Sequence, residues 1–213
     1  MSIAAVLYDL DGTLLDTRDM ILASFQYATR KVLQRKIPDA ELLDLVGIPL
    51  GEQMQHLDAQ HAQELVETYR THNQRVHDEL IRSFADTDET LAAIKVQGIP
   101  QVVVTSKRNE LAWRGLGCFN LQGYFDFLIG SDDTLRHKPE PEPLLLAAAR
   151  LGVPIERCVY LGDSPYDMRA ACSAGAIAVA ATWGIFTRDR LLAAGAQHEL
   201  ATISELPALL CSL

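Results

Sequence analysis

Four aspartates in this sequence have the side chain and the placement needed to bind a metal ion. Asp9 and Asp11 follow an apolar segment at the N-terminus, and Asp163 and Asp167 follow a second apolar segment. Asp9 and Asp11 are two residues apart, so their carboxylates can point the same way on an extended backbone. Carboxylates held close together repel each other, and a bound cation relieves that repulsion. Hard oxygen ligands of this kind favour Mg²⁺; the alternative is that each aspartate only caps a turn or a helix.

Two further polar residues stand where a substrate could bind. Thr105 ends the apolar run of residues 102–104, and Lys138 lies in a Pro-rich turn before a predicted helix. A threonine hydroxyl can donate a hydrogen bond to an anion, and a lysine ammonium can neutralise its charge. The adjacent Ser106 could share the role of Thr105, because the sequence does not fix which of the two faces the site. The alternatives are a strand-end hydroxyl bound by backbone and a solvated surface lysine.

Five short apolar segments are typical of buried strands in a parallel sheet. They cover residues 3–8, 101–105, 125–129, 158–161 and 176–180. Helical patterns lie between them, for example over residues 144–151 and 167–174. Strands that alternate with helices predict an α/β fold with a Rossmann-like parallel sheet sandwiched by helices. Ligands of such sheets bind at the carboxyl ends of the strands, which is where the polar residues named above fall.

The segment between the first two predicted strands is too long for a simple crossover connection. Residues 15–85 have the apolar periodicity of helices, and Thr17 is a candidate N-cap of the first one. We therefore expect an inserted all-helical domain at residues 15–85 and an α/β core domain at residues 1–14 and 86–213. The alternative is one domain with long helical loops. Polar neighbours predict that the histidines of the insert lie on solvated helix faces; they are His56, His61, His72 and His77.

The composition excludes several broad classes of protein. The chain has 213 residues, 48% hydrophobic and 22% charged, as in an ordinary soluble globular protein. Its 28 acidic residues exceed its 19 Lys and Arg, and the net charge of −9 argues against a nucleic-acid partner. We find no signal peptide and no apolar stretch near the roughly 18 residues of a membrane helix, so we expect no membrane partner and a cytoplasmic location. A bound phosphate must then be held by local groups rather than by a broad positive surface.

Four motifs, in order along the chain, resemble those of the haloacid dehalogenase superfamily. Asp9-Leu10-Asp11-Gly12-Thr13 resembles motif I, the DxDGT of the superfamily's phosphatases, and Thr105 resembles motif II. Lys138-Pro139-Glu140-Pro141 resembles the KPxP of motif III, and the segment 162–167 resembles the GDSxxD of motif IV. The resemblance covers nearly the whole chain, and it implies Mg²⁺-dependent phosphoryl transfer.

The resemblance also implies a role for each residue that would touch the phosphoryl group. Asp9 would be the nucleophile that forms an aspartyl-phosphate, and Asp11 would act first as acid and then as base. Thr105, helped by backbone amides near Ser106, would bind the phosphoryl oxygens. Lys138 would neutralise charge on the phosphoryl group and orient Asp9.

The same resemblance implies a metal site and a lid. The carboxylates of Asp9 and Asp163 and the backbone carbonyl of Asp11 would bind Mg²⁺, with Asp167 bound directly or through water. Residues 15–85 would be a type 1 cap, which closes over the site and so implies a small phosphorylated metabolite as substrate.

The subgroup and the exact reaction remain open between a few alternatives. The overall resemblance is to phosphoglycolate phosphatase-like enzymes, a subgroup that includes pyrophosphatases. A β-phosphoglucomutase-like enzyme is an alternative, although Leu50 stands roughly where those mutases commonly have an arginine. A non-catalytic scaffold is a further alternative, against which the complete motif set argues. Whether the chain is a monomer or a homodimer is left open.

Overall fold

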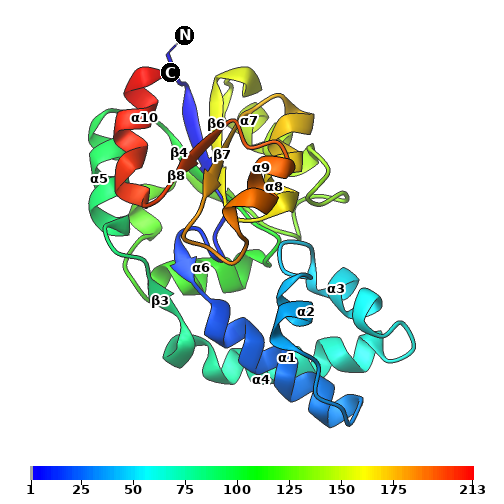
Figure 1. The fold of residues 1–213 in the computed structure, drawn as a ribbon. Coiled ribbons are helices and arrows are strands. Elements are labelled where there is room, and N and C mark those ends of the chain that lie inside the picture. The colour runs from blue at the N-terminus through cyan, green and yellow to red at the C-terminus, as the bar shows by residue number, and fades with distance from the viewer. Residues whose placement is uncertain (1) are drawn as a thin grey trace.

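The fold is organised around a parallel β-sheet, as the sequence predicts (Figure 1). The computed structural model describes residues 2–213. In spatial order the strands are β5 (Phe127–Ile129), β4 (Gln101–Val104), β1 (Ala5–Tyr8), β6 (Cys158–Gly162), β7 (Ile177–Ala181) and β8 (His198–Leu200). All neighbouring strands pair in parallel. The α/β fold class with a parallel sheet between helices is therefore confirmed.

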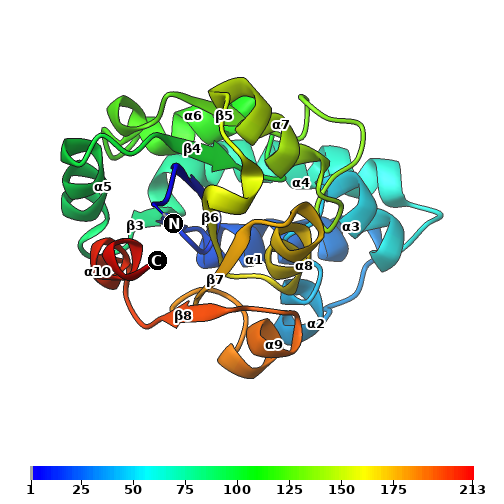
Figure 2. The same ribbon diagram turned by 90° about the horizontal axis from the view of Figure 1, so that it is seen from above.

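The central strands are apolar on both faces because helices cover both faces. On one face, side chains such as Leu7 and Val104 pack with α7 (Glu142–Leu151), α8 (Pro165–Ala174) and α9 (Arg188–Ala193). The alternate side chains, such as Val6 and Val103, point to the other face. That face is covered by α5 (Thr87–Val96), α6 (Asn109–Gly117) and α10 (Leu206–Ser212). Figure 2 shows α5 and α10 side by side on it.

The helices of residues 15–85 lie together at one end of the sheet, opposite the two chain termini (Figure 1). They are α1 (Arg18–Val32), α2 (Asp39–Leu43), α3 (Leu50–Leu57) and α4 (Ala62–Leu80). The long helices α1 and α4 pack against each other, and the rings of Phe25 and Tyr69 meet edge-on with their centroids 5.1 Å apart. We call residues 15–85 the cap from here on. Their status as a separate domain with these boundaries stays a prediction.

The cap differs from the expected purely helical segment at its base. Two short strands, β2 (Leu15–Asp16) and β3 (Arg82–Ser83), form an antiparallel pair there. They are the segments by which the chain enters and leaves the cap, and pairing satisfies their backbone groups. Thr17 does precede α1 at the N-cap position, but its hydroxyl makes no capping hydrogen bond.

The prediction that all four cap histidines are solvated is wrong for one of them. His56 is exposed and His61 and His72 are partly exposed, whereas His77 is fully buried. His77 lies in the last turn of α4, where it packs beside Gly115 of α6, and its Nδ1 pairs with Asp78 at 2.6 Å. The contact with α6 removes His77 from solvent, and that contact is invisible in the local sequence.

Two details of the sheet also depart from expectation. The edge strand β8 was not predicted, because its short His-Glu-Leu segment has no apolar run. The strand β5 begins at Phe127 rather than at residue 125, since a 3₁₀ turn, η1 (Gln122–Tyr124), precedes it. Two further 3₁₀ turns, η2 (Ile155–Arg157) and η3 (Ile203–Glu205), lead into β6 and α10.

None of the helices in residues 2–213 combines the length and the apolar character that membrane crossing requires.

The register of the central strands brings their carboxyl ends to one edge of the sheet. Tyr8 of β1 pairs with Val103 of β4 on one side and with Leu161 of β6 on the other. The residues that follow these three strands therefore emerge next to one another. The cap lies over the same edge.

Candidate active site

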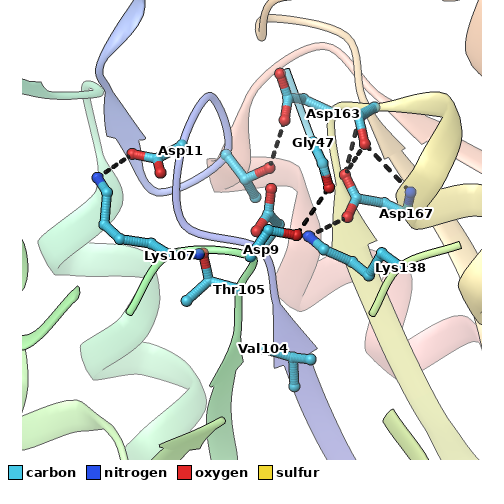
Figure 3. Close-up of polar contacts among 12 residues, drawn as sticks. Asp9, Asp11, Gly47, Val104, Thr105, Lys107, Lys138, Asp163 and Asp167 are labelled. Atoms are coloured by element: carbon cyan, nitrogen blue, oxygen red, sulfur yellow. Dashed lines mark hydrogen bonds and ion pairs between the residues drawn. The ribbon is translucent and has the colours of Figure 1, made fainter. Parts of the chain in front are cut away.

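The edge of the sheet beneath the cap holds a cluster of buried charged groups (Figure 3). Asp9 follows β1, Thr105 follows β4 and Asp163 follows β6, and Lys138 comes from the loop between β5 and α7. All four are buried, and all four line one cavity of about 180 Å³. The sequence thus places these residues on separate segments, and the fold brings them together.

Lys138 is the centre of the buried network. Its Nζ lies 2.9 Å from Asp9 Oδ1 and 2.6 Å from Asp167 Oδ1, and it donates a hydrogen bond to the Tyr160 hydroxyl at 3.1 Å. Burial by itself would lower the pKa of Lys138, but the carboxylates of Asp167 and Asp9 raise it above the ordinary value. The ammonium therefore stays charged at neutral pH.

Asp9 is a weaker acid than an ordinary aspartate. Burial, followed by the negative charge of Asp167, raises its pKa to about 7, against the opposing effect of Lys138. Its carboxylate is 6% exposed and faces the cavity. An additional positive charge in the cavity would favour the ionised form of Asp9.

The Asp163 side chain packs directly against Gly12 and Gly184, at positions where a residue with a Cβ atom would clash with it. It accepts hydrogen bonds from Thr13 Oγ1 at 3.3 Å and from the backbone N–H of Ile185 at 2.7 Å. A Cβ atom added to Gly12 or to Gly184 would lie 2.2 Å from an Asp163 side-chain atom. Burial, followed by the charges of Asp167 and Asp9, raises the pKa of Asp163 well above its usual range.

The residues present fit a bound Mg²⁺. Asp9, Asp163 and Asp167 each offer a carboxylate oxygen, and these oxygens lie within 4.8 Å of one another. With Lys138 they carry two net negative charges when all are ionised, which a divalent cation would balance. A donor set made of carboxylate oxygens suits Mg²⁺ rather than a thiophilic metal.

Asp167 differs from the other two carboxylates because its oxygens already have partners. Oδ1 accepts from Lys138 and, at 3.0 Å, from the Tyr160 hydroxyl. Oδ2 accepts from the Ser164 backbone N–H at 2.9 Å and from its hydroxyl at 2.6 Å, which completes a capping box at the start of α8. These contacts favour a role in holding Lys138, and the predicted metal role of Asp167 is easier to satisfy through a water.

Asp11 lies apart from the buried network. Its Oδ1 is 2.6 Å from Nζ of Lys107, and both side chains are partly exposed to the cavity (Figure 3). Lys107 follows Thr105 and Ser106 in the loop after β4, so this ion pair ties the loop after β1 to the loop after β4. The pair holds the carboxylate of Asp11 at the wall of the cavity.

Thr105 and Ser106 both line the cavity but have different partners. The Thr105 hydroxyl oxygen accepts from the Lys107 backbone N–H at 3.2 Å, which leaves its proton free for a ligand. The Ser106 hydroxyl instead donates to the backbone carbonyl of Gly47 in the cap at 2.8 Å. Of the two, Thr105 is the better donor to a phosphoryl oxygen, and Ser106 connects the core to the cap.

The cap supplies the other side of the cavity, and its lining is mostly uncharged. Apolar side chains come from α1, from the loop before α3 and from the first residue of α3; they are Met20, Ile21, Val46, Ile48 and Leu50. Polar side chains come from α3 and α4; they are Gln53, Tyr69, Arg70, Asn73 and Gln74. Gly47 approaches so closely that an added Cβ would lie 2.8 Å from the Tyr166 ring. The cap is therefore in contact with the core around the cavity.

Several residues of the site were not identified from the sequence. Tyr160 lies in an apolar strand segment, which predicts a core packing residue. Its hydroxyl nevertheless contacts Lys138 and Asp167. Lys107 directly follows the predicted phosphate-binding pair, and that adjacency is a signal that could have found it. Arg70 and Arg108 line the cavity, but no motif marks them.

Comparison with known proteins identifies a family model and relatives that match this chain. The family model described as haloacid dehalogenase-like hydrolase matches residues 6–181. PpaX of Caldanaerobacter subterraneus subsp. tengcongensis is 45% identical over 90% of this chain and 87% of its own length. The pyrophosphatase PpaX of Halalkalibacterium halodurans is 35% identical over 82% of this chain and 81% of its own length.

A solved structure agrees with these relatives. The crystal structure of a Bacteroides fragilis protein described as haloacid dehalogenase-like superposes with a TM-score of 0.90. The match covers 96% of this chain and 100% of the other, at 28% identity. The likeness thus extends over both the sheet and the cap helices.

Proposed function

Because the chain belongs to the haloacid dehalogenase-like hydrolase family, we propose that it hydrolyses small phosphorylated metabolites through an aspartyl-phosphate on Asp9. The observation that carries the proposal is the contact between Lys138 Nζ and the buried carboxylate of Asp9, at the wall of a small cavity. This contact places a charged ammonium beside a nucleophile that must approach an anionic phosphate.

The first step follows from the positions of Asp9, Lys138 and Thr105. A carboxylate oxygen of Asp9 attacks phosphorus, and the bond from phosphorus to the leaving oxygen breaks. Lys138 offsets the repulsion between the carboxylate and the phosphate, and the Thr105 hydroxyl donates to a phosphoryl oxygen. Burial strengthens both interactions, because water screens them less.

The second function of the site is proton transfer, which we assign to Asp11. Its carboxyl group lines the cavity and gives a proton to the leaving oxygen in the first step. In the second step it takes a proton from the water that attacks phosphorus, and the bond between phosphorus and Asp9 breaks. Free phosphate and the unmodified Asp9 carboxylate result.

We place Mg²⁺ at Asp9, Asp163 and the backbone carbonyl of Asp11, with Asp167 taking part through water. When bound, Mg²⁺ supplies charge neutralisation at the phosphoryl oxygens and at Asp9. Gly12 and Gly184 leave the space that the Asp163 side chain occupies beside this position, since a Cβ atom at either glycine would lie 2.2 Å from it.

The size of the cavity favours a small substrate. A volume of about 180 Å³ holds on the order of a dozen water molecules, which suits a small metabolite and excludes a folded protein. We propose a phosphoglycolate phosphatase-like activity on phosphomonoesters. Pyrophosphate is the second candidate, because the relative from Halalkalibacterium halodurans is named a pyrophosphatase.

The test is phosphate release from phosphoglycolate, pyrophosphate and sugar phosphates, with Mg²⁺ and with EDTA. We expect Mg²⁺-dependent release without a sugar bisphosphate activator, and its loss in Asp9→Asn. Release that requires the activator would indicate a phosphomutase, and release by Asp9→Asn at the native rate would contradict the proposal. Circular dichroism of Asp9→Asn confirms that the variant is folded.

A further inference from the structure

A second hollow of the molecule is an open groove on the cap, formed by α1 and α4. We call it the cap groove. It shares no lining residue with the active-site cavity; its lining consists of Ala23, Gln26, Tyr27, Arg30, Lys31 and His72. The proposed hydrolysis uses none of these residues. A ligand of the cap groove would therefore be distinct from the substrate in the cavity.

Two stacked aromatic rings form part of the cap groove. The rings of Tyr27 and His72 have their centroids 4.4 Å apart and an interplanar angle of 23°. His72 is held from behind, because its Nδ1 lies 3.2 Å from Oγ of the buried Ser24. That hydroxyl gives its own proton to the backbone carbonyl of Met20 at 2.8 Å, so His72 Nδ1 is the donor of the pair. The two rings are therefore in place before a ligand binds, and a flat aromatic ligand can extend the stack.

Positive charges surround the same stack. Lys31 Nζ lies 5.8 Å from the centroid of the Tyr27 ring, and the Arg75 guanidinium lies 5.9 Å from it. Lys31 belongs to α1 and Arg75 to α4, so both helices direct a cation to one ring, and Arg30 lines the groove beside them. Burial, followed by the charge of Arg75, lowers the pKa of His72 below its ordinary value. In a chain of net charge −9, the cap groove is therefore a local site for an anion.

The lining also contains a hydrogen-bond acceptor that has no partner within residues 2–213. It is the buried Oε1 of Gln26. The amide is fixed in its orientation, because Nε2 donates to the backbone carbonyl of Ile37 at 2.7 Å and to Asp39 Oδ1 at 2.8 Å. A buried acceptor without a donor costs free energy, and an N–H group of a ligand would recover that cost.

We infer that the cap groove binds a nucleotide, with its base against the stack of Tyr27 and His72 and its phosphates at the cations Arg30, Lys31 and Arg75. A nucleotide combines in one small molecule the flat base, the N–H groups and the anionic chain that these features match. A sugar phosphate lacks the aromatic base. A nucleic acid is disfavoured because the groove is short and the chain is acidic overall. The inference goes beyond the proposed hydrolysis and does not depend on it.

The experiment compares ATP with inorganic tripolyphosphate, which has a similar charge but no base. Calorimetry is performed on the whole protein in EDTA, so that Mg²⁺-dependent hydrolysis does not contribute. Tyr27→Leu removes the ring and keeps an apolar side chain, and Lys31→Met/Arg75→Met removes two charges. Two variants are controls: Arg169→Met removes a charge from an exposed position on α8, and Thr105→Val alters the active-site cavity.

The expected result separates the base from the phosphates. ATP should bind at least about 10-fold more tightly than tripolyphosphate, and Tyr27→Leu should remove that advantage. Lys31→Met/Arg75→Met should weaken binding of both ligands by about threefold to 10-fold, since these charges are exposed. Neither control should change either affinity by more than about twofold. Circular dichroism verifies that each variant is folded.

Three outcomes would overturn the inference. They are equal binding of ATP and tripolyphosphate to the native protein, no binding of either at concentrations up to about 1 mM, and weakening by Thr105→Val in place of the groove variants. The last result would place the nucleotide in the active-site cavity. Failure of the protein to release phosphate from any substrate would reject the proposed function and leave this inference standing, because the titration involves no turnover.

Discussion

The core side and the cap side of the cavity are built in opposite ways. On the core side, Asp9, Asp163, Asp167 and Lys138 are almost fully buried, and each has at least one charged or hydrogen-bonded partner within 3.3 Å. On the cap side the lining is apolar or uncharged, apart from Arg70, which is exposed and forms no ion pair. Both sides meet around one small cavity.

The difference indicates that the core side and the cap side of the cavity have different roles. Burying a charge costs free energy unless oppositely charged or hydrogen-bonding partners surround it. The buried charges of the core side therefore hold fixed positions, which suits a single reaction. The cap side has no buried ion pairs to maintain in this lining. Its residues can therefore determine which leaving group fits without moving the reacting groups of the core. Substitutions on the two sides should therefore have different effects, and the following experiments test that.

The largest effect is expected from Lys138→Met. Loss of the ammonium leaves Asp9 and Asp167 buried without their cation, and we expect kcat to fall by at least about 10³-fold and the unfolding free energy to fall by about 3–5 kcal/mol. Phosphate release and urea unfolding measure the two effects. The exposed Lys36→Met in the cap is the matched control and should change neither.

A double substitution separates folding from chemistry at Lys138. In Lys138→Met/Asp167→Asn one buried carboxylate is removed together with the ammonium, so stability should recover in part while kcat stays low. Recovery of activity along with stability would contradict the role assigned to Lys138 and would make it a purely structural residue.

The same substitution, glycine to alanine, can be made on the core side and on the cap side to compare them. Gly184→Ala places a Cβ 2.2 Å from Asp163, so we expect weaker Mg²⁺ activation and a fall in kcat of about 10-fold or more. Gly51→Ala on the cap meets no atom within 4 Å and lies in α3, so it should leave kcat unchanged and stabilise the fold by up to about 1 kcal/mol. Activity measured as a function of Mg²⁺ concentration gives kcat and Mg²⁺ activation for both variants. Equal effects of the two substitutions would contradict the difference between the core side and the cap side.

Much of the core side was predictable from the sequence, and the reason is geometric. Asp9, Thr105 and Asp163 each follow a strongly apolar strand, and adjacent parallel strands bring their carboxyl ends together. Tyr160 escaped prediction because a tyrosine within a buried strand has the pattern of a packing residue. Its use as a hydrogen-bond partner depends on Lys138 arriving from another loop.

The cap side was far less predictable. The cavity residues of α4, such as Arg70 and Asn73, differ in no local way from other polar residues of that helix, and only the placement of α4 over the sheet selects them. The burial of His77 has the same origin, since it depends on α6. Contacts between segments far apart in the sequence decide these features.

The smallest effect expected is a pH dependence of stability from His77. Burial lowers its pKa below the ordinary value, because a protonated Nε2 would have no acceptor where it lies. The unfolded chain then binds a proton more readily, so His77 costs stability as the pH falls through about 6.5 and below. Urea unfolding between about pH 7.5 and 5.5 should show a steeper loss for the native protein than for His77→Gln, and equal slopes would contradict this account.

The measurement that tests the central claim most directly is to trap the phosphoryl group on Asp9. Acid quench during turnover, followed by peptide mass analysis, should find one added phosphoryl group on the N-terminal peptide that contains Asp9. Hydroxylamine should remove that group, as expected of an acyl phosphate, and Asp9→Asn should never acquire it. Steady hydrolysis with no phosphorylated Asp9 at any quench time, or a phosphoryl group found on another residue, would contradict the account.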